Sequence, residues 1–73
     1  MEHNTGVVLN SDYIRLGDVL RGDSRVEAVV LWDEVNNTYG VEVGERRDVW
    51  CELVTYLVQD ENLKVVGNIL KRS

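Results

Sequence analysis

Hydrophobic and polar residues alternate most regularly in two short runs near the middle of the chain, residues 26–32 and 38–43. Alternation with period two, carried by β-branched residues, is typical of half-buried strands. The residues between the runs, 33–37, are acidic and rich in Asn, so the pattern predicts a β-hairpin. The positions expected to share the inward face are Val26, Ala28, Val30 and Trp32 in the first run and Tyr39, Val41 and Val43 in the second.

Two other stretches have apolar or polar residues at helical spacing. In residues 12–21, one face of a helix would carry Tyr13, Leu16, Val19 and Leu20, with Ser11 or Asp12 as N-cap. In residues 48–59, the polar residues are Asp48, Glu52, Thr55 and Gln59, with steps of four, three and four. This period outweighs the strand propensity of the valines, so the pattern predicts a helix with Asp48 as N-cap. Residues 63–70 are compatible with a third strand or a tail element.

These elements predict an α+β fold: a short helix, a β-hairpin, a second helix and a possible third antiparallel strand. At 73 residues the chain is expected to be a single small domain, 1–73, with residues 1–6 and 71–73 frayed. A chain of this length buries only about 60% of its unfolded surface. The expected core comprises Tyr13, Leu16, Leu20, Val30, Trp32, Val41, Trp50, Leu53 and Leu57.

The residue composition gives little support for a catalytic or metal-binding site. The chain has one cysteine, Cys51, and one histidine, His3, whereas a structural zinc site takes four Cys or His ligands. Cys51 is expected to be a buried structural residue. We therefore predict no enzyme activity, no metal site and no cofactor. The longest apolar run is five residues, Ala28 to Trp32, and there is no secretory signal pattern, so a cytoplasmic location without membrane insertion is expected.

The distribution of charge along the chain bears on the class of binding partner. The formal net charge is −5, yet residues 62–73 carry three bases and no acid. An acidic body favours a larger protein partner with a basic surface, because complementary charge steers association. Trp and Arg are the residues most enriched at interface hot spots. The predicted partner-binding residues are Trp32, Asp33, Glu34, Glu42, Glu45, Arg46, Arg47 and Trp50; the alternative for both tryptophans is a place in the core.

Nucleic-acid binding is the alternative function. It would use Arg46 and Arg47 with the C-terminal bases Lys64, Lys71 and Arg72. Phosphate repulsion opposes a protein with this net charge, so nucleic acid is not expected as a direct ligand.

A small, acidic, proline-free chain without an active-site motif resembles accessory proteins encoded by bacteriophages. Within that group it is similar to small regulators that bind bacterial RNA polymerase. Leu16-Gly17-Asp18-Val19-Leu20 followed by the Val26–Val43 hairpin also resembles the start of a small all-β SH3-like barrel, the alternative fold. The polymerase resemblance implies a cytoplasmic transcription regulator that modulates initiation or termination, by inhibition or antitermination, through occlusion or clamping at a subunit surface. It supplies no contact residue, because no family motif aligns.

Overall fold

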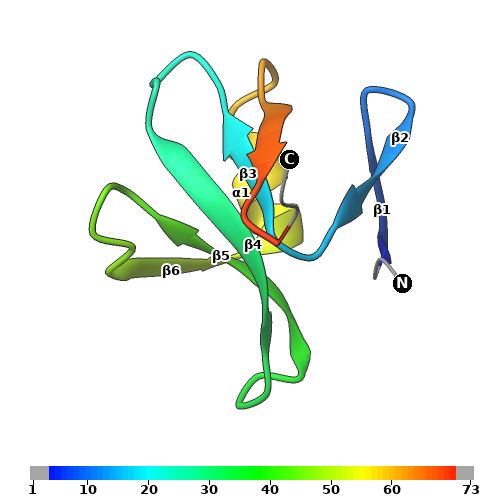
Figure 1. Ribbon diagram of the computed structural model, residues 1–73, viewed down its shortest axis with the longest axis vertical. Helices are drawn as coiled ribbons and strands as arrows, with labels where there is room; N and C mark the ends of the chain where they lie inside the picture. Colours follow the sequence, from blue (N-terminus) through cyan, green and yellow to red (C-terminus); the bar gives the residue numbers. More distant parts are fainter. Residues whose placement is uncertain (1–3, 71–73) are drawn as a thin grey trace.

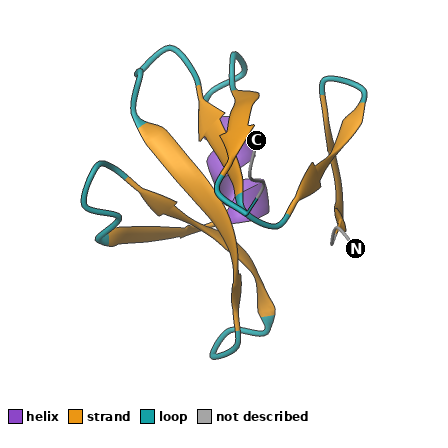
Figure 2. Ribbon diagram, in the orientation of Figure 1, coloured by secondary structure: helices purple, strands orange, loops and turns teal. Residues whose placement is uncertain are grey.

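The computed structural model describes residues 4–70, which form seven strands and one short helix (Figures 1 and 2). The strands are β1 (Asn4–Leu9), β2 (Asp12–Arg15), β3 (Asp18–Arg21), β4 (Glu27–Asp33), β5 (Thr38–Val43), β6 (Val49–Glu52) and β7 (Lys64–Asn68). The helix α1 (Leu53–Gln59) links β6 to β7. The prediction of an α+β fold with two helices is therefore wrong, and the all-β SH3-like alternative is closer to the structure.

Five strands form one antiparallel sheet in the order β6-β5-β4-β3-β7, and β1 and β2 form a separate hairpin. The last strand returns to pair with β3, so the sheet curls around one core. Leu53, at the start of α1, is buried in that core, and α1 packs next to β5 and β6. Figure 2 shows the helix on one side of the curved sheet and the β1–β2 hairpin next to the β3–β7 side of the sheet. We call the face toward Leu53 the inner face and the opposite one the outer face.

The central hairpin is confirmed. Strands β4 and β5 pair Ala28 with Val43, Val30 with Val41, and Trp32 with Tyr39, which places these six predicted inward positions on the same face. The prediction is wrong for Val26, which precedes β4 and is exposed. Alternation specified the register here because a slip of one residue would turn Val30 and Val41 to the outer face.

The helix predicted over residues 12–21 is wrong. The segment forms β2 and β3, joined by a turn at Leu16 and Gly17. Gly17 has φ +86°, a conformation that glycine adopts without steric cost. Its N–H donates to the Val30 carbonyl at 2.7 Å, and its carbonyl accepts from the Ile69 N–H at 2.9 Å. These long-range bonds hold the turn against both neighbours of β3 and break the helical pattern.

The helix predicted over residues 48–59 is half wrong. Val49–Glu52 form the edge strand β6, and only Leu53–Gln59 are helical. The N-cap is Glu52 rather than Asp48, and it makes no side-chain capping bond. For residues 49–52, strand propensity predicted the structure correctly, and the helical spacing of the polar residues did not. The C-terminal residues left open between strand and tail form the strand β7.

The core is smaller and less aromatic than expected. Leu20, Val30, Val41 and Leu53 are buried as predicted. They pack with Ala28, an expected inward position, and with two residues that sequence reasoning missed, Ile14 and Leu63. Tyr13, Trp32 and Trp50 are instead exposed. Of the N-terminal residues expected to be frayed, 1–6, residues 4–6 lie in strand β1. Residues 1–3, with His3, and 71–73 lie outside the described residues.

Candidate functional site

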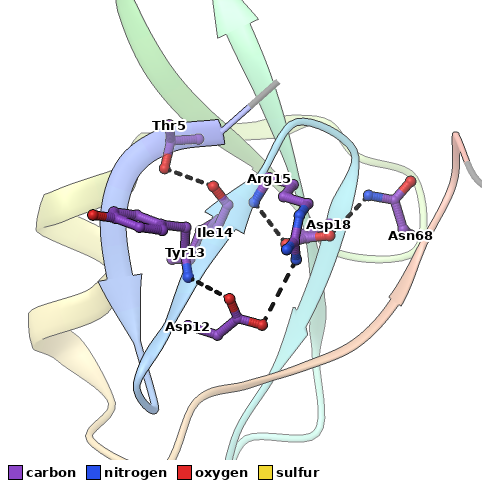
Figure 3. A network of polar contacts seen from close by, with 7 residues as sticks. All are labelled: Thr5, Asp12, Tyr13, Ile14, Arg15, Asp18 and Asn68. Atoms are coloured by element: carbon purple, nitrogen blue, oxygen red, sulfur yellow. Dashed lines mark hydrogen bonds and ion pairs between the residues drawn. The ribbon is translucent and has the colours of Figure 1, made fainter. Parts of the chain in front are cut away.

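The one buried charged side chain within residues 4–70 is Asp18, at the start of β3. Its carboxylate accepts hydrogen bonds from the Arg15 backbone N–H at 2.7 Å and from the Asn68 amide at 2.8 Å (Figure 3). The Asn68 amide also donates to the Leu16 carbonyl at 3.1 Å. Asp18 therefore joins the β2–β3 turn to β7. Because its oxygens already have partners in the fold, we assign it a structural role.

Trp50 is the most exposed aromatic feature of the outer face. Across the sheet it lies in one row with Val19, Val29 and Glu42, which pair in sequence from β3 to β6. Its side chain is 45% exposed. The indole lies over Gly40, which is buried beneath it, and a Cβ atom at that position would overlap the ring. Glu42 pairs with Trp50, and Glu52 pairs with Gly40 in the next row, so both acidic residues neighbour Trp50 on the outer face. The Glu52 carboxylate accepts a hydrogen bond from the Thr55 hydroxyl at 3.2 Å.

Trp32 lies on the opposite face of the sheet from Trp50. Its ring meets that of Tyr39 edge-on, with centroids 4.9 Å apart and planes at 73°. It is 44% exposed, so neither tryptophan belongs to the core. The two residues are thus nearly equal in exposure but project from different faces.

Asp33 and Glu34 lie at the tip of the β4–β5 hairpin. The Asp33 carboxylate accepts hydrogen bonds from the Asn36 side chain at 2.7 Å and from the Val35 N–H at 2.9 Å. The Asn36 side chain is the main cause, with the backbone N–H groups adding to it, of a lowered Asp33 pKa. Asp33 thus stabilises the turn, which leaves Glu34 as the freer carboxylate of the pair.

Glu45, Arg46 and Arg47 form the β5–β6 turn at the other end of the hairpin. All three are exposed, and neither arginine forms an ion pair within residues 4–70. The Arg47 N–H donates to the Gly44 carbonyl at 3.1 Å, which closes the turn.

The structure divides the predicted partner-binding residues into two groups. Glu42, Trp50 and the turn of Glu45, Arg46 and Arg47 belong to the outer face and its margin. Trp32, Asp33 and Glu34 lie toward the hairpin tip, about 10–17 Å away along β5 at ~3.3 Å per residue. The two groups therefore form two separate surfaces rather than one site.

An open groove of about 540 Å³ lies on the outer face over the β3–β4 end of Trp50's row, and sequence reasoning missed it. Its floor is made by Val19, Val29 and Ile69, and Arg25 and Arg47 line it from two turns. We call it the Arg25–Arg47 groove. One sequence signal for it was present: the turns Gly22-Asp-Ser-Arg25 and Gly44-Glu-Arg-Arg47 follow the same pattern.

A second hollow adjoins the groove through Arg25 and is also lined by Arg21 and Lys64. The nucleic-acid alternative named Arg47 and Lys64, and the structure places these bases around the two adjoining hollows. Asp23, Glu27 and Glu45 line the same hollows, which reduces the local positive charge. Lys71 and Arg72 lie outside the described residues.

No group of three His, Cys, Asp or Glu residues among residues 4–70 is arranged to hold a metal ion. Cys51 is partly buried and packs against the core. Over the same residues, no helix has the length and apolar character needed to cross a membrane.

Comparisons with known proteins place no restriction on function. No protein-family model, no curated protein and no solved structure matches this chain. Function is therefore inferred from the outer face, the groove and the charges around them.

Proposed function

We propose that this chain is a non-enzymatic protein-binding module that docks through the outer face of its sheet with Trp50 as the anchor. The observation that carries the proposal is the half-exposed indole seated on the buried backbone of Gly40. A tryptophan on the solvent side of a sheet contributes little to the core. Fixed by the strand beneath it, it loses little conformational freedom when a partner covers it, which favours binding.

The charges around the indole favour a partner with a basic surface. Glu42 and Glu52 flank Trp50 on the same face, and neither forms an ion pair within residues 4–70. A Lys or Arg of the partner placed over the indole would gain a cation–π contact of about 0.5–2 kcal/mol. It would also lie on the face that carries Glu42 and Glu52. The net charge of −5 adds long-range attraction to the same kind of surface.

The proposed partner is a larger protein with such a basic surface, and a bacterial RNA polymerase subunit is the specific candidate. This choice rests on the resemblance in size and charge to phage-encoded polymerase regulators. Docking would occlude or clamp a subunit surface and so modulate transcription initiation or termination in the bacterial cytoplasm.

Binding to purified bacterial RNA polymerase tests the proposal. The full chain, immobilised through one terminus, is expected to bind the enzyme at low salt and to lose affinity as salt rises, because exposed charges are screened over about 8–10 Å near physiological ionic strength. Trp50→Ala is expected to weaken binding at least tenfold, as hot-spot tryptophans do. Trp32→Ala is the matched control, since it removes an equally exposed tryptophan from the other face.

Three outcomes contradict the proposal. Absence of binding at low salt rules out the polymerase as partner. Loss of binding in Trp32→Ala but not in Trp50→Ala moves the docking surface to the hairpin tip. Tight binding of generic DNA or RNA in a mobility shift, with a steep salt dependence, favours the nucleic-acid function instead.

A further inference from the structure

The Arg25–Arg47 groove has the composition of a ligand site rather than of a bare sheet surface. Its volume of about 540 Å³ lies within the range of roughly 300–1,000 Å³ typical of small-ligand pockets. Val19 and Val29 are cross-strand partners on β3 and β4, and they form an apolar floor that Ile69 extends. Val26 and Gly44 complete the lining toward the two turns.

The two turns that border the groove have the same unusual construction. Each begins with a glycine whose carbonyl accepts the N–H of an arginine three residues later, at 3.0 Å for Arg25 and 3.1 Å for Arg47. The two arginines have φ values of 61° and 54°. This left-handed conformation favours glycine and is strained for a residue with a Cβ. Arginine is thus held at the two strained positions that supply side chains to a single groove.

The charges in the groove favour an anionic ligand. Arg25 and Arg47 form no ion pair within residues 4–70. Of the two acids in the lining, Glu27 is already paired with Arg21, at 3.8 Å, which leaves Glu45. Among the charged residues of the lining, Arg25 and Arg47 therefore stand against one acid that has no ion pair within residues 4–70, Glu45.

The groove is polar at one end and apolar along its length. The arginines come from the turns after β3 and β5, whereas Ile69 follows β7 and donates its N–H to Gly17 at the opposite end of β3. Strand β3 has four residues, so the distance between the two ends is about 10–13 Å at ~3.3 Å per residue. This length accommodates about three residues of extended peptide.

We propose that this groove binds the free C-terminal carboxylate of a partner protein whose last residues are aliphatic. The carboxylate would lie between Arg25 and Arg47, which are suited to charge-assisted, two-pronged hydrogen bonding. The last side chains would cover Val29 and Val19 and extend toward Ile69. The site does not depend on the function proposed above, because Trp50 does not line the groove.

A fluorescence-anisotropy titration tests the assignment. The probe is a fluorescein-labelled hexapeptide that ends in three valines, prepared as the free acid and as the C-terminal amide. The free acid is expected to bind the full chain at low salt, and the amide at least tenfold more weakly, because hydrogen bonds to charged groups contribute about 1.5–3 kcal/mol. Arg25→Gln and Arg47→Gln are each expected to weaken binding of the free acid at least tenfold.

The controls separate the site from general electrostatics and from misfolding. Arg46→Gln removes the same charge from the same turn but from a residue outside the groove, so it is expected to change affinity less than twofold. Trp50→Ala is likewise expected to leave peptide binding within twofold. Arg47→Gly keeps the turn, because glycine is favoured at φ 54°, yet it is expected to lose binding as Arg47→Gln does.

Several results would overturn the proposal. These are equal binding of the acid and the amide, equal losses in Arg46→Gln and Arg47→Gln, or no binding of the free acid at millimolar concentration and low salt. Binding of decanoate without binding of the peptide assigns the groove to a fatty acid instead. Because polymerase binding and peptide binding are measured on different probes, each proposal fails or survives separately.

Discussion

Gly40 controls the position of Trp50, so Gly40→Ala is the sharpest test of the outer face. A Cβ atom at Gly40 would lie 2.7 Å from the indole Cζ2, whereas carbon atoms in favourable contact are about 3.5–4.0 Å apart. The backbone of Gly40 lies in the middle of β5, paired on both sides, and cannot retreat. The indole must therefore rise by roughly 1 Å or swing away from the sheet.

The cost of displacing the indole can be worked out from its burial. An aromatic side chain buries about 150–250 Å² when fully covered, and Trp50 is 45% exposed, so about 100 Å² is at stake. At about 25 cal/mol per Å² this amounts to ~2.5 kcal/mol for complete displacement. Replacing glycine by alanine stabilises a compatible site by about 0.4–1 kcal/mol. The expected net change is a destabilisation of about 1–2 kcal/mol, or roughly 4–16 °C in Tm for a domain of this size.

A double-mutant cycle monitored by thermal and urea unfolding isolates the contact. In a Trp50→Ala background the obstructing ring is absent, so Gly40→Ala is expected to be neutral or to stabilise by up to about 1 kcal/mol. Trp50 fluorescence, recorded in a Trp32→Phe background so that one tryptophan remains, is expected to shift to the red in Gly40→Ala. Equal destabilisation with and without Trp50, or unchanged stability and emission in Gly40→Ala alone, would refute the reasoning.

Three further predictions concern the turns and the buried network. Arg47→Gly is expected to raise stability by about 0.5–1 kcal/mol in urea, because it relieves a left-handed arginine, whereas Arg46→Gly in the same turn is expected to give no gain. Asn68→Ala leaves an oxygen of buried Asp18 without its amide donor and is expected to cost about 1–3 kcal/mol by chemical denaturation; an unchanged midpoint would contradict this. Asp33→Ala is expected to lower Tm relative to the natural chain above about pH 4, the unfolded pKa, and this difference is expected to vanish as pH falls through the lower folded pKa. A Tm difference that is constant with pH would contradict the assigned role of the Asp33 charge.

The hairpin was predictable because its signal was local and redundant. Residues 26–32 and 38–43 alternate over several positions, and the acidic, Asn-containing loop agrees with the strands on either side. A wrong register would have exposed Val30 and Val41, which are fully buried. The local alternation and the burial of Val30 and Val41 therefore specify the same hairpin register.

The segment of residues 12–21 was not predictable from its period because two strands of four residues are too short to establish one. Leu16 and Leu20 satisfy a helical spacing by coincidence, and only Gly17 indicated a turn. The reason for the turn lies elsewhere in the chain: Gly17 bonds to Val30 and Ile69, and Asp18 bonds to Asn68. Such long-range contacts leave no mark on the local pattern of a single sequence.

The tryptophans show why the candidate site was only partly predictable. A chain without phenylalanine was expected to build its core around its few aromatic residues, but the core is aliphatic, made of residues such as Ile14, Leu20 and Leu53. The residues of the outer face follow from the same alternation as those of the core, since each inward position of β4 and β5 implies an outward one. Alternation alone, however, does not distinguish a solvated outward residue from one that forms a site.

The distinction comes from how the outer face is built. Gly40 gives up a side chain so that Trp50 can lie over it, and Arg25 and Arg47 occupy conformations in which glycine would be more stable. Each of these choices costs stability in a chain whose small size leaves little to lose. They lie on the same face of the same sheet; Asn10, Ser11 and Asn37, which also have positive φ, lie in the turns that follow β1 and β4. Because conformations that cost stability persist where they serve a function, the three outer-face features are the structural reason to propose the binding function there.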